Sequence, residues 1–289
     1  EHERLHTIPL NKAYEFVQAM ADITDTYILV GNHDMINNQQ FLNSNHWMNA
    51  MKEWHNVTII DRPTTITAPN NQFYMMCPYV PNGRLKEALD TSVNDDTTAN
   101  DDTTANDDTS TNDTTANDDT ANDDTSTNDS SSEDSNQFDW HDSILLFVHQ
   151  EMCGCKMGAI VSVDGDQWDE TLPPIISGHI HSNQKLLNGH VYYPGSAMQH
   201  AFGDPKCIIA LITVDVTSDP GIDHNGQLPY TIEEIDLNLR KKRLMYHDLD
   251  SIDTLDMSKL LNQPDEIKLG LCGNYNDYKI FKSTDQYKQ

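Results

Sequence analysis

The sequence is poor in basic residues and in cysteine, and it lacks a long apolar run. Only 18 Lys and Arg stand against 46 Asp and Glu, and the formal net charge at pH 7 is −28. This balance argues against a broad basic surface for nucleic acid, because such binding depends largely on neutralising phosphates. The five cysteines are odd in number and unpaired in pattern, which indicates an intracellular rather than a secreted protein. No apolar run approaches the roughly 20 residues of a membrane helix, and no signal peptide is visible.

One segment, from Thr91 to Gln137, contains no Lys, no Arg and no aromatic residue. It consists almost only of Asn, Asp, Thr, Ala and Ser, and a six-residue unit at Asn94–Ala99 recurs at Asn100–Ala105. The segment holds 14 of the acids, so the rest of the chain has 32 acids against 18 bases. It lacks the glycines and apolar positions of calcium-binding repeats. Because nothing in it can offset its ordering entropy, we predict a disordered surface insert.

The remaining sequence alternates between helical and strand patterns. Apolar residues at helical spacing predict a helix from about Pro9 to Ile23. Continuous apolar runs predict fully buried strands at Thr26–Val30 and Ser143–Val148. Weaker patterns predict an amphipathic helix around Trp47, Met48, Met51 and Trp54, and strands at Asn56–Ile60, Thr64–Ala68, Gln72–Cys77, Pro174–Ser177, Val191–Tyr193 and Cys207–Val214. The alternation predicts an α/β fold.

Histidines and an asparagine follow several of these strands. Gly31-Asn32-His33-Asp34 follows one strand, His149 follows another, and Gly178-His179-Ile180-His181 follows a third. In open α/β sheets the ligand crevice lies beyond the carboxyl ends of the strands, so we expect these side chains to meet. Imidazole nitrogen and amide oxygen both bind divalent metal ions. A single histidine after a strand is more often structural, but the three motifs together indicate a metal site.

In this order the motifs resemble those of the calcineurin-like metallophosphoesterases: D-x-H, G-D, G-N-H-[DE], a strand-final His and G-H-x-H. The resemblance implies two divalent metal ions, with Mn²⁺ expected and Mg²⁺, Fe²⁺ or Zn²⁺ as alternatives. It implies that Asn32, His149 and His179 bind the second ion and that His181 binds the first. Two such ions lower the pKa of a bridging water and neutralise charge in an in-line displacement.

The same resemblance gives roles to the two other residues of the first motif. His33 would contact the scissile phosphate and assist the leaving group, and Asp34 would orient its ring. The family's first two motifs do not occur in this sequence, and we expect them upstream of Glu1. We therefore predict that this chain by itself is weakly active or inactive. His46, His55, His141, His190 and His200 match no motif and are assigned to structure or solvent.

A finer resemblance extends over Gly178–Gln184 and Tyr193–Asp204. These segments are similar to the G-H-x-H-x-x-Q and Y-P-G-S-x-x-Q-x-x-F-G-[DE] signatures of SbcD and meiotic-recombination (Mre-type) nuclease subunits, including phage and viral relatives. The resemblance implies a DNA exo- or endonuclease subunit in recombination and repair. Its partners would be DNA and an SMC-like ATPase (SbcC/Rad-type), with a homodimer as a further option. The basic run Arg240–Arg243 is a candidate DNA contact.

Two other functions remain open at this point. The acidic balance favours a phosphatase or a small-molecule phosphodiesterase of the same superfamily, and a catalytically defective scaffold is the second alternative. In each case the resemblance implies an αββα fold, a β-sandwich core flanked by helices. We expect the metallophosphoesterase domain over residues 1–219, the disordered insert over residues 91–137, and a partial capping domain over residues 240–289, with Glu266–Cys272 as one of its strands.

Overall fold

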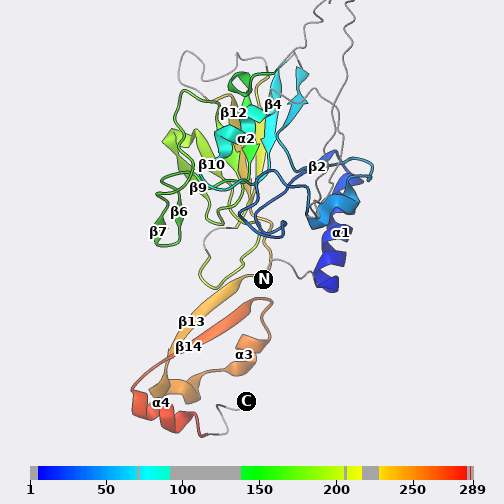
Figure 1. Cartoon of the computed structure of the whole chain (residues 1–289). Helices are drawn as coiled ribbons and strands as arrows, with labels where there is room; N and C mark the ends of the chain where they lie inside the picture. Colours follow the sequence, from blue (N-terminus) through cyan, green and yellow to red (C-terminus); the bar gives the residue numbers. More distant parts are fainter. Residues whose placement is uncertain are drawn as a thin grey trace, which may run out of the picture.

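The computed structural model describes residues 6–69, 72–91, 138–204, 207–216, 228–284 and 287. These residues form a mixed α/β body and a smaller C-terminal module (Figure 1). Residues 92–137 of the predicted disordered insert lie outside the described residues. Its first residue, Thr91, is the last residue of helix α2 (Leu85–Thr91). The predicted domain limits at residues 1, 219 and 289 also lie outside the described residues.

A mixed sheet lies at the centre of the body, with the strand order β3-β4-β5-β8-β10-β9. The strands are β3 Thr64–Thr67, β4 Phe73–Cys77, β5 Leu145–Val148, β8 Ile175–Ser177, β9 Gln184–Leu186 and β10 Val191–Tyr193. The inner strands β4, β5, β8 and β10 are parallel, whereas β3 and β9 run antiparallel to their neighbours. Parallel strands end at the same edge of a sheet, so the segments that follow β4, β5 and β8 are neighbours.

Alternate residues of the inner strands face opposite sides of this sheet. One side of the sheet packs against α2. Each fully buried leucine of α2 contributes about 1.5–3 kcal/mol to the stability of the fold, relative to an exposed position. The other side packs against the hairpin of β11 (Ile209–Val214) and β12 (Tyr230–Ile235). The predicted α/β class is confirmed, the central sheet is mixed, and the calcineurin-like sandwich stays a prediction.

A second unit of the body contains α1 (Thr7–Ala21), β1 (Thr26–Leu29), the 3₁₀ helix η1 (Trp47–Met51) and β2 (Val57–Ile60). The strands β1 and β2 are parallel. Two predictions were wrong here. The second amphipathic helix is only the short η1, because the chain turns into β2 through Asn56, which has a positive φ of 59°. The first strand is only half-buried, because within the described residues β1 pairs with β2 alone.

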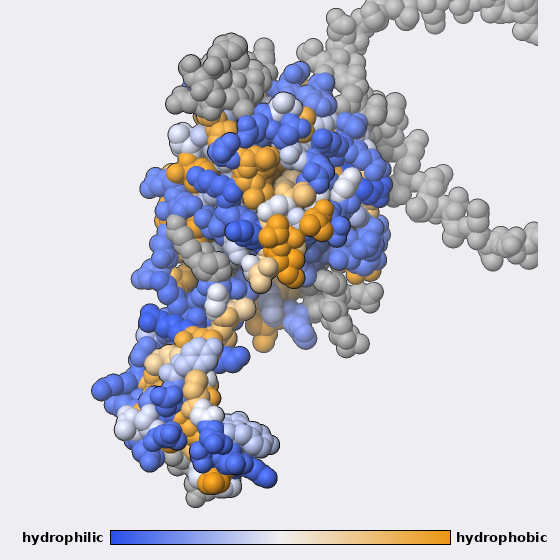
Figure 2. All heavy atoms as spheres, turned by 90° about the vertical axis from the view of Figure 1, so that its left-hand side faces the viewer, coloured by the Kyte–Doolittle hydropathy of each residue, from blue (hydrophilic) through white to orange (hydrophobic). Residues whose placement is uncertain are grey.

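The C-terminal module projects from the body, as Figures 1 and 2 both show. It consists of β13 (Lys242–Asp248), η5 (Leu249–Thr254), α3 (Met257–Leu261), β14 (Glu266–Cys272) and α4 (Tyr275–Phe281), and β13 and β14 are parallel. The predicted strand Glu266–Cys272 is confirmed. The assignment of this region as a capping domain stays a prediction.

Short elements complete the body: η3 (Trp140–Asp142), η4 (Leu187–Gly189) and the hairpin of β6 (Lys156–Met157) and β7 (Ile160–Val161). Ile160 and Val163, in and just after that hairpin, are 66% and 75% exposed. Figure 2 views this side of the molecule and shows apolar surface in the middle of the body with polar surface around it. Among the described helices, none has the length and apolar character needed to cross a bilayer.

Candidate functional site

The Gly31–Asp34 turn directly follows β1 and is closed by the Asp34 carboxylate. The Gly31 N–H donates to Asp34 Oδ2 at 2.8 Å, and the Trp47 indole N–H donates to Asp34 Oδ1 at 2.8 Å. The Asp34 N–H donates in turn to the Gly31 carbonyl at 3.1 Å. Asp34 therefore fixes the turn that carries Asn32 and His33. Its predicted role in orienting the His33 ring stays a prediction.

His149 lies beside Asn32, although 117 residues separate them in the sequence. The His149 Nε2 and Asn32 Oδ1 atoms are 3.3 Å apart, which is a hydrogen-bond contact. Two donor atoms that each lie about 2.1 Å from one metal ion, at angles between square and tetrahedral, are separated by about 3.0–3.4 Å. The pair therefore fits a shared divalent ion.

Two motif glycines make room for the His149 ring. A Cβ atom on Gly178 would lie 2.7 Å from His149 Nδ1, and a Cβ on Gly31 would lie 3.0 Å from His149 Nε2. Both distances are too short for ordinary carbon–nitrogen contacts. The first glycine of each motif therefore leaves room for an imidazole that comes from a third segment of the chain.

His179 completes this group from the turn after β8. Its φ of 68° is left-handed, a conformation that costs a non-glycine residue on the order of 1 kcal/mol or more. Its ring meets the His149 ring edge to face, with centroids 5.3 Å apart and planes at 80°. The His179 ring also stacks on Tyr79, with centroids 5.7 Å apart and planes at 24°. The structure thus brings together Asn32, His149 and His179 from three separate turns.

His181 lies near a histidine that sequence reasoning missed. The rings of His181 and His200 stack at 4.7 Å and 29°. The Asp204 carboxylate holds His200 in place, because its Oδ2 accepts from the N–H groups of His200 and Ala201 at 2.7 and 2.8 Å. The proximity of His200 to the Y-P-G-S segment in the sequence was the only signal that could have placed it beside the G-H-x-H motif.

Burial and repulsion from neighbouring histidines lower the pKa of two imidazoles of this group, those of His149 and His179. Burial, together with the charges of the nearby His179, His33 and His181, lowers the pKa of His149 to about 3. Burial also lowers the pKa of His179, against the opposing effect of the Glu151 carboxylate. The neutral imidazole is the form that binds a metal ion. The lowered pKa values of His149 and His179 favour this form at neutral pH.

A buried polar network supports the end of β5. The backbone carbonyl of Gln150 accepts from the hydroxyls of Ser177 and Tyr193, at 2.8 and 3.0 Å. The Gln150 side chain donates to Asp166 Oδ2 at 2.7 Å, and Asp166 Oδ1 accepts from the Leu85 N–H at the start of α2. Because these groups are buried and hydrogen-bonded, they hold His149 in one position.

Within the described residues, no group of three or more His, Cys, Asp or Glu side chains is arranged to hold a metal ion. The contact that fits a shared ion is the one between His149 and the Asn32 amide oxygen. His33, Asp34 and the four predicted ligands keep their predicted roles as hypotheses.

Comparison with known proteins gives the family. The chain is 38% identical over 281 residues to "Putative phosphoesterase 244L" of Invertebrate iridescent virus 6, covering 97% of this chain and 81% of that protein. The chain belongs to this phosphoesterase family. It is also 34% identical over 288 residues to "Putative phosphoesterase 078R" of Invertebrate iridescent virus 3, covering 100% of this chain and 67% of that protein. No protein-family model matches the sequence. As a phosphoesterase, the chain is a hydrolase acting on ester bonds.

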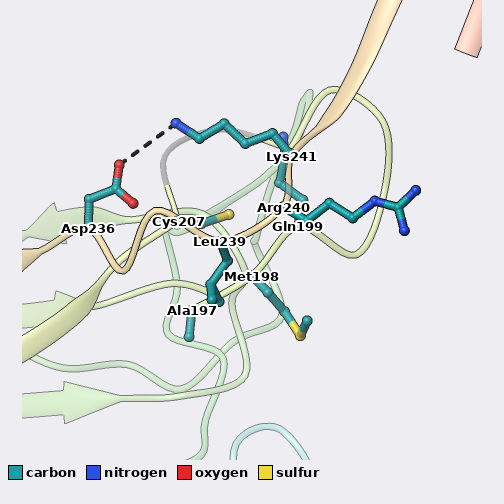
Figure 3. Close-up of a pocket in the computed structure, with 8 residues that line it drawn as sticks. All are labelled: Ala197, Met198, Gln199, Cys207, Asp236, Leu239, Arg240 and Lys241. Carbon is teal, nitrogen blue, oxygen red and sulfur yellow. Dashed lines mark ion pairs between the residues drawn. The ribbon is translucent and has the colours of Figure 1, made fainter. Parts of the chain in front are cut away.

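The phosphoesterase also has a pocket of about 240 Å³ beside the loop that carries His200 (Figure 3). It is lined by Ala197, Met198, Gln199, Cys207, Asp236, Leu239, Arg240 and Lys241. Lys241 forms an ion pair with Asp236 at 3.9 Å, and the Gln199 amide bonds Lys242 and Asp204. The Arg240 side chain extends away from the other side chains in Figure 3. The polar groups of this pocket therefore connect the body to the C-terminal module.

Proposed function

We propose that this phosphoesterase is a metal-dependent DNA exo- or endonuclease subunit of a recombination-repair complex. The observation that carries the proposal is the convergence of Asn32, His149 and His179 at the carboxyl ends of separate strands. Neutral nitrogen and amide donors leave a bound cation with most of its charge, and that charge attracts an anionic phosphodiester. Asn32, His149, His179 and His181 would hold the ions, expected to be Mn²⁺. When bound, divalent ions supply a water of lowered pKa and offset the charge of the transition state.

The residues of the chain have separate tasks in this proposal. His33 meets the scissile phosphate and gives a proton to the leaving oxygen. Asp34 holds the turn that presents His33, through its bonds to Gly31 and Trp47. The Gln150 network fixes the position of His149. A general acid of this kind typically contributes about 10²–10⁴-fold to the rate.

DNA is favoured over small esters by the similarity of Tyr193–Asp204 to the nuclease-subunit signature. In the structure, His200 of this segment stacks on His181. Its carbonyl accepts a hydrogen bond from Lys242 of the C-terminal module. An SMC-like ATPase is the expected protein partner, and a second copy of the chain is a further option. The net charge of −28 favours the alternative, a phosphatase or small-molecule phosphodiesterase. A scaffold without activity is the third candidate. It is favoured because, among the described residues, no three His, Cys, Asp or Glu side chains are arranged to hold a metal ion.

Metal binding tests the proposed site first. Mn²⁺ is titrated into the metal-free chain, and free Mn²⁺ is followed by electron paramagnetic resonance. We expect His149→Ala to weaken binding by at least about tenfold, since the loss of a ligand should cost no less than the loss of its hydrogen-bonded support. The exposed His55 gives the matched control, and His55→Ala should bind as the unchanged chain does. Equal binding by His149→Ala would contradict a metal site at this cluster.

Hydrolysis then separates the three functions. The chain with Mn²⁺ is assayed on labelled single- and double-stranded DNA and on p-nitrophenyl phosphate and its diester. We expect low, Mn²⁺-dependent turnover of DNA that His149→Ala abolishes. Faster hydrolysis of the monoester than of DNA would instead support the phosphatase. Mn²⁺ binding without hydrolysis of any substrate would support the scaffold if it persists in a chain extended upstream to include the two expected motifs.

A further inference from the structure

We propose that Tyr79 is a positioning residue that fixes the three turns carrying Asn32, His149 and His179 relative to one another. Its consequence for metal binding rests on the proposed function. The positioning itself concerns only contacts among described residues and can be tested without a metal. Tyr79 matched no motif in the sequence, and its side chain is 6% exposed.

The position of Tyr79 follows from the sheet. It comes two residues after the end of β4, which is the parallel neighbour of β5. Tyr79 therefore lies at the same edge of the sheet as His149, which directly follows β5. Pro78 and Pro81 flank the segment and restrict its backbone, and Pro81 disfavours a helical conformation at Val80.

The first turn is tied to Tyr79 through the backbone. The Tyr79 N–H donates to the carbonyl of Val30 at 2.8 Å. Val30 is completely buried and directly precedes Gly31 and Asn32. A shift of the Tyr79 segment would therefore move the start of the turn that carries Asn32.

The second turn is tied through Gln150, the residue after His149. The Gln150 side chain donates to the Val80 carbonyl at 2.8 Å and accepts from the Val80 N–H at 3.3 Å, as a neighbouring strand would. Gln150 is completely buried. In addition, the Tyr79 ring meets the His149 ring edge to face, with centroids 6.4 Å apart and planes at 77°.

The third turn is tied to Tyr79 through ring stacking. The Tyr79 ring lies nearly parallel to the His179 ring, at 24° and 5.7 Å between centroids. The His179 backbone is in the left-handed region, which a non-glycine residue keeps only where its surroundings hold it. Tyr79 supplies such a contact by stacking on the ring, and His149 supplies another through a T-shaped contact.

The backbone and the ring of Tyr79 make different contacts, so substitutions can test the ring by itself. Replacing the side chain leaves the bond to Val30 in place and removes the contacts with both imidazoles. Tyr79→Phe keeps the ring, and Tyr79→Leu removes it. Tyr230 gives a matched control, because it is also 6% exposed and packs on the far side of the sheet, where its hydroxyl donates to the Gly189 carbonyl.

The test is the contact between the His149 and His179 rings in the metal-free chain, measured by nuclear Overhauser effects between their imidazole protons. We expect this contact in the unchanged chain, in Tyr79→Phe and in Tyr230→Leu, and its loss in Tyr79→Leu. Should Tyr79→Leu fail to fold, Tyr79→Met fills a similar volume without a planar ring and takes its place. Persistence of the contact in the leucine or methionine variant would overturn the proposal, and so would its loss in Tyr230→Leu, which would point to general destabilisation.

Metal affinity gives the second readout. With Mn²⁺ we expect the dissociation constant to rise about tenfold in Tyr79→Leu and to stay unchanged in Tyr79→Phe and Tyr230→Leu, because ligand placement by supporting side chains is typically worth about 10–100-fold. Unchanged affinity in Tyr79→Leu would contradict the proposed consequence for metal binding. If the unchanged chain binds no Mn²⁺, the proposed function fails, and the ring contact still decides the role of Tyr79.

Discussion

At the scale of single residues, the position of the His149 ring depends on two glycines, Gly31 and Gly178. Gly31 lies next to Nε2 of the His149 ring and Gly178 next to Nδ1, and a methyl group on either would contact the ring. Steric contact with the His149 ring therefore explains why each motif has glycine at this position. This reason cannot be recognised from either motif by itself. The sequence placed Asn32, His149 and His179 at strand ends, and the structure shows that they meet.

Gly178→Ala is expected to displace the His149 ring, because the new Cβ would lie 2.7 Å from His149 Nδ1. Overpacking of this kind costs about 1–3 kcal/mol of stability. We also expect weaker Mn²⁺ binding. Urea unfolding and Mn²⁺ titration measure the two effects.

Gly83→Ala is the control for that substitution. Gly83 has a φ of 81° and no neighbouring atom within 4 Å of an added Cβ, so alanine there strains the backbone without crowding the site. It should lower stability and leave Mn²⁺ binding unchanged. Unchanged Mn²⁺ binding in Gly178→Ala would show that the His149 ring has room to move.

At the scale of elements, an ionic cluster joins η1 to the end of β2. His46 and Lys52 flank η1, and both bond the carboxylate of Asp61, at 3.2 and 2.5 Å. Burial would raise the pKa of Asp61, but these two hydrogen bonds and the Lys52 charge together lower it to about 2. Asp61 follows β2, so the cluster holds the strand beside β1 and its motif turn.

Asp61→Asn is expected to cost about 2 kcal/mol of unfolding free energy at neutral pH, from the shift of its pKa. A carboxylate with a lowered pKa stabilises the fold fully above its unfolded value of about 3.8, and this contribution is lost as the pH falls towards 2. The difference between the variant and the unchanged chain should therefore shrink between about pH 4 and pH 2. Urea unfolding across this range measures it, and the exposed Asp25→Asn should show little effect at any pH. A difference that stays constant with pH would rule out the ionic explanation.

Element prediction from the sequence worked where burial gives a continuous apolar run. The strands at Leu145–Val148, Ile175–Ser177 and Val191–Tyr193 are buried on both faces and were predicted within two residues. The short β9 and the exposed β13 were missed, because an edge strand or an exposed strand carries polar residues that match no apolar pattern. Contacts between segments, such as those of Tyr79 and His200, arise only once the chain is folded. No local pattern could have predicted them.

At the scale of the whole molecule, Lys242 joins the body to the C-terminal module. Its Nζ donates to the His200 carbonyl at 2.8 Å and lies 6.0 Å from the centre of the Phe202 ring. Lys268 of β14 lies on the same ring at 5.9 Å. The loop beside His181 is thus in contact with both strands of the module.

Lys242→Met is expected to loosen this loop. A cation–π contact at an exposed site contributes about 0.5–1 kcal/mol, so the amides of His200 and Ala201, which Asp204 protects, should exchange their hydrogens about two- to fivefold faster. Hydrogen exchange followed by mass spectrometry measures the change. Lys259→Met, at a side chain that is 81% exposed, should leave the loop unaffected. An unchanged exchange rate in Lys242→Met would show that the module does not restrain the loop.

Asp90 precedes the repeat-rich segment and Trp140 follows it. The Trp140 indole N–H donates a hydrogen bond to the Asp90 carboxylate at 2.8 Å. It holds together the places where the chain leaves α2 and where it returns towards β5. A doubling of the length between two such fixed points costs only about 0.6 kcal/mol of closure entropy. We therefore expect that the number of repeats can change, or that a reporter peptide can replace them, while the edge of the sheet that carries His149 keeps its geometry.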